Sequence, residues 1–174
     1  GNSPYLTFEW KTDNESKYHE VQTRLIGEYN FPNALAAVTI GHFFGVEPEK
    51  IDKALAGYTP QNNRSQLKKT ADNTLIIDAY NANPTSMMAS ISNFRNMQAE
   101  NKMLILGDMR ELGKDSADEH QKIADYLEEC GFKDVVLVGE LFAATRHSYQ
   151  SYPDVTALIA ELQREKPCGK TILI

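Results

Sequence analysis

Two polar segments of this 174-residue sequence carry side chains that could bind a ligand. The first segment, residues 78–86 (DAYNANPTS), offers a carboxylate, a phenol, two carboxamides and two hydroxyls. It precedes a predicted helix, whose first backbone amides have no partner within the helix and add further donors. The segment could therefore hold a polar ligand through several directed hydrogen bonds. Asn and Asp are also common turn and cap residues, so a purely structural role remains an alternative.

The second segment, residues 107–113 (GDMRELG), follows another short apolar run in the same way. Polar loops that follow neighbouring strands of a parallel sheet form one side of a cleft. Asp78 ends the first of these strands, and a carboxylate at that position suits the vicinal hydroxyls of a ribose. The two segments are therefore the leading candidates for a binding site.

Three further positions are ambiguous. Arg64 lies in a polar connection and could contact a nucleotide or another anion, although a lone arginine is more often a surface residue. His120 stands on a predicted helix, where a surface or capping position is more common than a catalytic base. The segment 29–33 (YNFPN), at a predicted helix start, is compatible with capping or with recognition of a base.

Several motifs of catalytic and metal sites are absent from the sequence. It contains neither the phosphate loop that ends in Gly-Lys-Ser/Thr nor the Gly-x-Gly-x-x-Gly dinucleotide fingerprint. It also lacks the Gly-x-Ser-x-Gly nucleophile elbow and any His, Cys and carboxylate cluster with metal-ligand spacing. Cys130 and Cys168 are too few for a disulfide framework. We therefore predict no catalytic residue and no metal ligand in this sequence. Any phosphoryl transfer would need catalytic residues from another part of the protein.

The elements that would position these side chains fall into two groups. The first group has the pattern of a hairpin with a polar loop, followed by two helices that each begin at a proline and end at a glycine. By residue number these are strands 5–10 and 19–26 around the loop 11–17, and helices 32–44 and 48–56. A hairpin and two helices are too little to close a core. We therefore expect residues 1–63 to be the tail of a larger domain, with the polar stretch 59–64 as the boundary.

From about Leu67 onward, short apolar strands alternate with amphipathic helices. This alternation implies parallel pairing with right-handed crossovers, and so an open, mostly parallel, Rossmann-like α/β sheet flanked by helices. Ser116 and Glu119 have the spacing of a capping box, and Asp154 can cap the last helix. Ligands of such sheets bind at the carboxyl ends of the strands. The predicted strands are 74–78, 103–106, 135–138 and 171–174, and the ligand-facing loops are 78–86, 107–116 and 139–142.

The composition disfavours other classes of function. The formal net charge of −6, from 18 basic and 24 acidic residues, disfavours binding to nucleic acids or anionic membranes. Eight acidic and three basic residues between Asp108 and Glu129 account for five of these charges, which a solvated helix face explains. No apolar run approaches the roughly 18 residues that span a bilayer, and the N-terminus lacks a secretory pattern. We therefore expect a cytoplasmic protein with no membrane or nucleic-acid partner.

Four stretches of the sequence together resemble the Mur ligases, the ATP-dependent amide-forming enzymes of peptidoglycan synthesis. The pair YNANP and GDMxELG is specific to the branch of this family that adds D-alanyl-D-alanine. Tyr29 departs from the family's usual histidine, which weakens a specific role for this position. The four stretches, which extend over most of the chain, are GEYNFPNALAA at 27–37, Arg64 after Pro60, DAYNANPTSM at 78–87, and LGDMRELG at 106–113 with Ser116 and His120.

The resemblance implies a two-part organisation and a reaction. Residues 1–63 would end the family's central ATP-binding domain, and residues 64–174 would form most of its C-terminal domain. ATP and Mg²⁺ would be the cofactors, held mainly by residues upstream of this sequence. ATP would phosphorylate the carboxylate of UDP-N-acetylmuramoyl-tripeptide, and the amine of D-Ala-D-Ala would then attack the acyl phosphate. On this interpretation the chain is an excised piece of a monomeric ligase and is inactive alone.

The resemblance also assigns roles to single residues. Asn33 would contact the adenine, while Arg64 and Asp78 would contact the ribose and the neighbouring phosphate. The residues that would face the incoming dipeptide are Tyr80, Asn81, Asn83, Ser86, Asp108 and Glu111.

Two alternatives stay open at this point. The same fold could serve another Mur ligase or a folylpolyglutamate-type ligase, because these relatives differ in the loop after Asp78 and accept other amino acids. The chain could also be a non-catalytic α/β module whose loops bind a partner.

Overall fold

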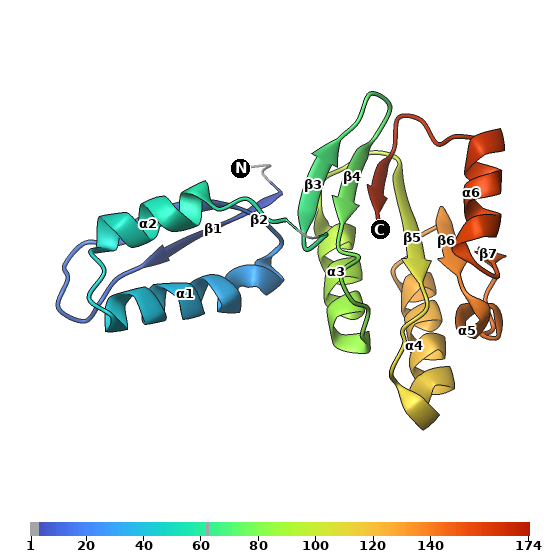
Figure 1. Ribbon diagram of the computed structural model, residues 1–174, viewed down its shortest axis with the longest axis horizontal. Helices are drawn as coiled ribbons and strands as arrows, with labels where there is room; N and C mark the ends of the chain where they lie inside the picture. Colours follow the sequence, from blue (N-terminus) through green and yellow to red (C-terminus); the bar gives the residue numbers. More distant parts are fainter. Residues whose placement is uncertain (1–3, 62) are drawn as a thin grey trace. The chain divides into compact units, whose positions relative to one another are not determined.

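The computed structural model describes residues 4–61 and 63–174, which fold into two compact units (Figure 1). The first unit extends to Gln66 and the second begins at Leu67. The predicted boundary segment 59–64 includes Asn62, which lies outside the described residues. Each unit has an apolar core of its own.

The first unit is a β-hairpin packed against two helices, and these elements agree with the prediction. Strand β1 (Tyr5–Trp10) pairs antiparallel with β2 (His19–Ile26), and alternate residues of both strands are buried on one face. A short 3-10 helix, η1 (Glu28–Asn30), leads into α1 (Phe31–Phe43), and α2 (Pro48–Gly57) follows. The core residues are Leu6, Phe8, Trp10, Val21, Ala34, Val38 and Ile51.

Helix α1 is apolar around most of its circumference, yet only one side of it is buried. Ala34 and Val38 belong to the core of the first unit. On the other side of the helix Leu35 and Ile40 are exposed, and Phe43 exposes 80% of its surface. A helix that is apolar on all sides is usually covered on all sides. The exposed side of α1 therefore has the composition of an interface.

A polar cluster joins the loop end of the hairpin to α2. His19 Nδ1 lies 2.8 Å from Asp52 Oδ2, and His19 Nε2 lies 3.3 Å from Glu15 Oε1. The Trp10 ring stacks on the imidazole of His19, and the indole N–H of Trp10 donates to Asp52 Oδ1 at 2.7 Å. The hydrogen bond to Asp52, supported by Glu15, raises the pKa of His19 above its ordinary value, because both carboxylates favour the imidazolium. The cluster therefore stabilises the first unit most when His19 is protonated.

A six-stranded sheet forms the centre of the second unit. Its strand order is β3-β4-β8-β5-β6-β7, and the pairs β4–β8, β8–β5, β5–β6 and β6–β7 are parallel. The predicted open, mostly parallel α/β sheet is therefore confirmed. The strands are β3 (Gln66–Lys69), β4 (Thr74–Ile77), β5 (Lys102–Gly107), β6 (Val135–Val138), β7 (Gln150–Tyr152) and β8 (Thr171–Leu173).

Helices cover both faces of this sheet. Helices α3 (Pro84–Asn96) and α4 (Ser116–Glu129) lie side by side on one face (Figure 1). The connection from β7 to β8 runs back across the sheet, so a right-handed crossover places α6 (Val155–Arg164) on the opposite face. Leu158 of α6 packs there against Met103 and Val136. None of the helices in the described parts of the chain is long and apolar enough to cross a membrane.

The two edge strands, β3 and β7, are missing from the sequence-based prediction. Both are short, and Lys68, Lys69 and Gln150 are polar residues. An edge strand can expose most of its side chains, so it needs no run of apolar residues. The periodicity that identifies the central strands is therefore too weak at both edges.

The capping box predicted from Ser116 and Glu119 is wrong. The 3-10 helix η2 (Gly113–Asp115) runs directly into α4, so Ser116 is already helical and Asp115 is the cap without a side-chain hydrogen bond. The predicted cap of α6 is confirmed, because Asp154 Oδ1 accepts from the backbone N–H of Ala157 at 2.8 Å.

Candidate functional site

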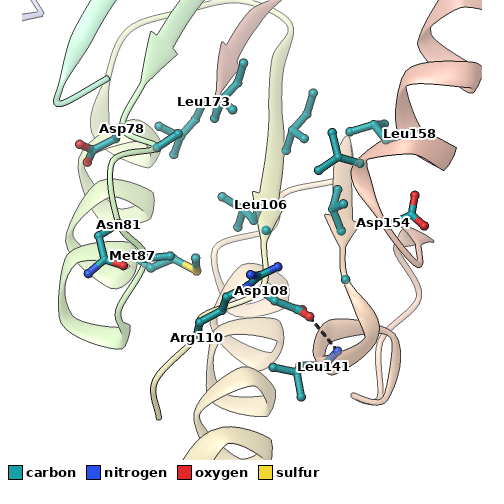
Figure 2. A pocket seen from close by; sticks show the side chains of 18 of the residues that line it. Asp78, Asn81, Met87, Leu106, Asp108, Arg110, Leu141, Asp154, Leu158 and Leu173 are labelled. Carbon is teal, nitrogen blue, oxygen red and sulfur yellow. Dashed lines mark hydrogen bonds between the residues drawn. The ribbon is translucent and has the colours of Figure 1, made fainter. Parts of the chain in front are cut away.

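The loops that follow β4, β5 and β6 meet in one pocket of about 970 Å³ at the carboxyl ends of the strands (Figure 2). Residues of the strands form an apolar floor that includes Ile105, Val138 and Leu173, and the start of α6 closes one side. All three loops predicted to face a ligand contribute to the lining. The polar side chains of the lining include Asp78, Asn81, Ser86, Asp108, Arg110, Glu140 and Asp154.

Asp78 is fixed at the side of the pocket formed by α3. Its backbone N–H donates to the carbonyl of Ile174 at 2.7 Å, which extends the pairing of β4 with β8 by one residue. Its carboxylate accepts a hydrogen bond of 2.5 Å from the hydroxyl of Ser90, a buried residue of α3. The carboxylate is thereby held at the edge of the pocket.

A capping box stabilises the end of the loop after β4. Asn83 caps α3, and its Oδ1 accepts from the backbone N–H of Ser86 at 3.0 Å. The Ser86 hydroxyl lies 3.4 Å from the backbone N of Asn83 in return, which completes a capping box. Tyr80 exposes 60% of its surface, and Asn81 is among the residues that line the pocket. The loop therefore combines a fixed end at Asn83 with an open middle.

The loop after β5 is instead tied to the neighbouring loop by Asp108. Its Oδ2 accepts from the backbone N–H of Leu141 at 3.0 Å, drawn in Figure 2, and its Oδ1 accepts from that of Phe142 at 2.9 Å. These two amides begin the short helix α5 (Glu140–Ala143). Both carboxylate oxygens of Asp108 are thus used within the protein. The predicted contact of Asp108 with a substrate stays a prediction, and the structure gives this residue a definite structural role.

Gly139 is required where these two loops touch. It has φ of +125°, a backbone conformation that L side chains rarely adopt, and a Cβ at this position would overlap the Asp108 carboxylate. The glycine therefore allows Asp108 to reach the first amides of α5.

His120 lies beneath the same loop and is completely buried, so its prediction as a surface or capping residue is wrong. Its Nε2 accepts from the backbone N–H of Met109 at 3.0 Å, and its Nδ1 lies 2.6 Å from the carbonyl of Ser116. Because Nε2 accepts a hydrogen bond and Nδ1 faces a carbonyl oxygen, this arrangement requires the neutral imidazole with its proton on Nδ1. The ring also packs edge-on against Phe142, with centroids 4.7 Å apart. His120 therefore holds the loop after β5, the start of α4 and α5 together.

Arg110 and Glu111 stand at the outer end of this loop. Arg110 is exposed and lines the pocket, whereas Glu111 is exposed outside the lining. Glu111 has φ of +70°, a strained conformation for a residue with a side chain. The backbone before Arg110 is fixed by the hydrogen bond from the Met109 N–H to His120, and the backbone after it adopts this strained conformation.

Two predicted nucleotide contacts, Asn33 and Arg64, belong to the first unit. Asn33 is exposed at the start of α1, and its Nδ2 donates to Asn30 Oδ1 at 3.1 Å. Asn30 is buried and donates to the carbonyl of Ile26 at 2.8 Å and to Ser65 Oγ at 3.2 Å. The Tyr29 hydroxyl also lies 2.7 Å from Ser65 Oγ, which gives this tyrosine a structural contact.

The pocket brings together only some of the predicted site residues. Asp78, Asn81, Ser86 and Asp108 line it, while Tyr80, Asn83 and Glu111 lie in the same loops outside the lining. The sequence-based prediction missed Ser90, Arg110 and Asp154 as lining residues. For Arg110 a signal was available, because it lies between Asp108 and Glu111, two residues that were predicted.

Within residues 4–61 and 63–174, no group of three or more His, Cys, Asp or Glu side chains could hold a metal ion. The polar rim of the pocket is suited instead to hydrogen bonding and charge pairing with an organic ligand.

The sequence matches a protein family described as "Mur ligase, glutamate ligase domain" over residues 63–174. Two relatives named UDP-N-acetylmuramoyl-tripeptide–D-alanyl-D-alanine ligase come from Bacillus subtilis and Escherichia coli. The former is 45% identical over 91 residues, which cover 51% of this chain and 20% of the relative. The latter is 31% identical over 148 residues, which cover 83% of this chain and 32% of the relative. The chain thus spans about a fifth to a third of the length of these curated relatives.

Solved structures show the same fold. A crystal structure of MurF from Acinetobacter baumannii matches 98% of this chain and 38% of its own, with a TM-score of 0.77 and 28% identity. A MurF ligase from Thermotoga maritima in complex with ADP matches 98% of this chain and 42% of its own, with a TM-score of 0.75. Its identity of 16% supports a shared fold alone.

Proposed function

This chain belongs to the Mur ligase family, and from that premise we propose that it is part of an ATP-dependent ligase that joins D-Ala-D-Ala to UDP-N-acetylmuramoyl-tripeptide. The observation that carries this proposal is that the two loops whose motifs mark the D-alanyl-D-alanine-adding branch line the same pocket. The relatives from B. subtilis and E. coli, which carry that name, support the same acceptor.

In this proposal the second unit binds and orients the amino acceptor. The amine of the dipeptide must approach an activated carboxyl group, and ATP supplies that activation when it is bound. Asn81 and the loop around it provide directed hydrogen bonds, while the apolar floor excludes water from the reacting groups. Residues such as Asp108 and His120 contribute by keeping the second loop in place.

The nucleotide contacts form a separate part of the proposal. The exposed carboxamide of Asn33 suits the donor and acceptor edge of adenine, the Arg64 guanidinium suits a phosphate, and the Asp78 carboxylate suits ribose hydroxyls. The described residues contain no group of three or more His, Cys, Asp or Glu side chains that could hold Mg²⁺.

We also propose that residues 1–63 form the end of an ATP-binding domain, and two observations support this. The exposed apolar side of α1 has the composition of a covered surface, and the A. baumannii structure extends far beyond the 38% that this chain matches. We further propose that the full-length protein is a cytoplasmic monomer.

The test of this function is ligation by the full-length protein that contains this chain. The protein should form one product and release one phosphate per ATP with D-Ala-D-Ala as acceptor. Parallel reactions with L-alanine, D-glutamate and meso-diaminopimelate distinguish other Mur ligases, and glutamate on a folate distinguishes a folylpolyglutamate-type ligase. A protein that prefers one of these acceptors would refute the proposed substrate.

A non-catalytic α/β module makes a different prediction for the pocket. Under our proposal, Asp78→Ala and Asn81→Ala each lower kcat/KM for ligation by the full-length protein about tenfold or more, because each removes a polar contact. Unchanged ligation in both variants would favour the alternative, in which the loops serve another partner.

The nucleotide contacts can be tested separately from the acceptor. Arg64→Ala should raise the KM for ATP about tenfold, which corresponds to about 1.4 kcal/mol, and leave the KM for the dipeptide unchanged. An unchanged KM for ATP would show that Arg64 does not contact the nucleotide.

A further inference from the structure

Arg110 is the one basic side chain among the described residues that line the pocket. Four acidic residues, Asp78, Asp108, Glu140 and Asp154, share the lining with it. In Figure 2 the Arg110 side chain projects into the pocket between Asn81, on the side of α3, and Leu141, on the side of α5. The guanidinium therefore places a positive charge in the middle of a mostly acidic rim.

Three of the four acidic side chains already accept hydrogen bonds from other groups. Asp108 accepts from two backbone amides of α5, and Asp154 accepts from the backbone N–H of Ala157. Asp78 accepts from the Ser90 hydroxyl. Arg110, in contrast, has no hydrogen-bond acceptor or ion-pair partner within the portion of the chain that the structure describes. Its five N–H donors are therefore available to a ligand.

The backbone next to Arg110 is held in place by hydrogen bonds to α4 and α5. Met109 is completely buried, and its N–H donates to His120 at 3.0 Å. Asp108, on the other side of Met109, is fixed to α5. A charged side chain that is presented on a fixed backbone can recognise a partner at low cost in conformational entropy.

We propose that Arg110 binds the terminal carboxylate of the amino acceptor and selects acceptors with a free carboxylate. This inference rests on the proposed function, because it names the group that the pocket recognises in the dipeptide. The planar guanidinium can donate two parallel hydrogen bonds to a carboxylate, a geometry that neither an amide nor an ester reproduces. The free amine at the other end of the dipeptide then points away from Arg110, toward the carboxyl group that it attacks.

The experiment measures ligation by the full-length protein with D-Ala-D-Ala and with its C-terminal amide, D-Ala-D-Ala-NH₂. The wild type should prefer the free carboxylate about ten- to a hundredfold in kcat/KM, the range expected for a hydrogen bond to a charged group. Arg110→Gln should lose most of this preference, by lowering kcat/KM for D-Ala-D-Ala and leaving that for the amide nearly unchanged. Arg110→Lys should restore part of it, since lysine keeps the charge without the paired donors.

Arg146→Gln is the matched control. Arg146 is exposed on the loop after α5, lies outside the pocket lining, and its removal changes the net charge by the same amount. This variant should keep the wild-type preference for the free carboxylate. A general effect of net charge would instead change both variants equally.

The outcomes distinguish the role of Arg110 from the proposed ligase function. Equal losses for both acceptors in Arg110→Gln, or a wild type that ligates both equally well, would overturn the role of Arg110 and leave the proposed function intact. A wild type that ligates neither acceptor would refute the proposed function and this inference with it.

Discussion

Two of the three loops that meet at the pocket, those after β4 and β5, are built in different ways. The loop after β4 ends in a short-range contact, the capping box between Asn83 and Ser86, and Tyr80 in its middle is exposed. The loop after β5 is held by long-range contacts to two other elements, through Asp108 to α5 and through Met109 to His120 of α4. One side of the pocket can therefore adapt to a ligand, while the other is fixed before the ligand arrives.

The strongest test of the fixed loop is Gly139→Ala. The new Cβ would overlap the Asp108 carboxylate, and the backbone would keep a φ of +125° that alanine disfavours. We expect the free energy of unfolding to fall by roughly 3 kcal/mol or more, from strain and overpacking together. Urea denaturation of the chain measures this change.

Gly107→Ala is the control for that substitution. No atom lies within 4 Å of a Cβ built there, so the variant should lose less than about 1 kcal/mol. Similar losses in the two variants would show that the contact between Asp108 and α5 is not the constraint.

The second test replaces His120 by phenylalanine. The substitution keeps most of the buried volume but leaves the Met109 N–H and the Ser116 carbonyl without their partner. We expect a loss of about 2 kcal/mol in unfolding free energy, because a buried amide without an acceptor costs about 1–3 kcal/mol. A loss below about 0.5 kcal/mol would mean that packing, and not hydrogen bonding, holds the loop.

The third test addresses the open loop. Asn83→Ala removes the cap of α3 and should cost about 1 kcal/mol of unfolding free energy. Asn81→Ala, in the middle of the same loop, should change stability by less than about 0.5 kcal/mol, since it is a surface change. If Asn81→Ala destabilised the chain as much as Asn83→Ala, the middle of the loop would not be free to adapt.

The smallest expected effect is a change of stability with pH. It arises from His19 in the first unit, so it must be separated from the stability of the two loops, which belong to the second unit. The pKa of His19 is raised by its hydrogen bond to Asp52, so its contribution to stability is fully present below the ordinary value of 6.5. That contribution is lost as the pH rises through the higher pKa of the folded state. Thermal unfolding measured between about pH 6 and pH 8 should show a modest decrease in stability.

His19→Gln should flatten this pH dependence. His42→Gln is the matched control, because His42 is exposed on α1 and has no partner within the described residues. A pH dependence that survives in His19→Gln would have to originate from another group and would contradict this assignment.

The sequence was sufficient to predict the central elements of both units. Strands such as 135–138 are apolar at every position, and a hairpin or a helix with proline at its start has a local signal. The edge strands β3 and β7 have no such signal, since their stability comes from pairing with neighbours that lie elsewhere in the sequence.

The candidate site was predictable in its loops but not in the roles of single residues. Asp108 stands in a conspicuous motif, yet the partners of its carboxylate are amides more than 30 residues away. For His120 a signal was present, because it precedes Ile123, Ala124 and Leu127 at helical spacing and so falls on the buried face of α4. Because histidine is polar, it was not counted with the apolar residues of this face.

The most direct measurement is a crystal structure of the full-length protein with the product of the proposed ligation, UDP-N-acetylmuramoyl-pentapeptide. Our proposal predicts that the terminal D-Ala-D-Ala lies in the pocket, with its carboxylate on Arg110 and Asn81 within hydrogen-bonding distance of its peptide groups. A terminal D-Ala-D-Ala bound outside the two loops, with the pocket empty, would contradict it.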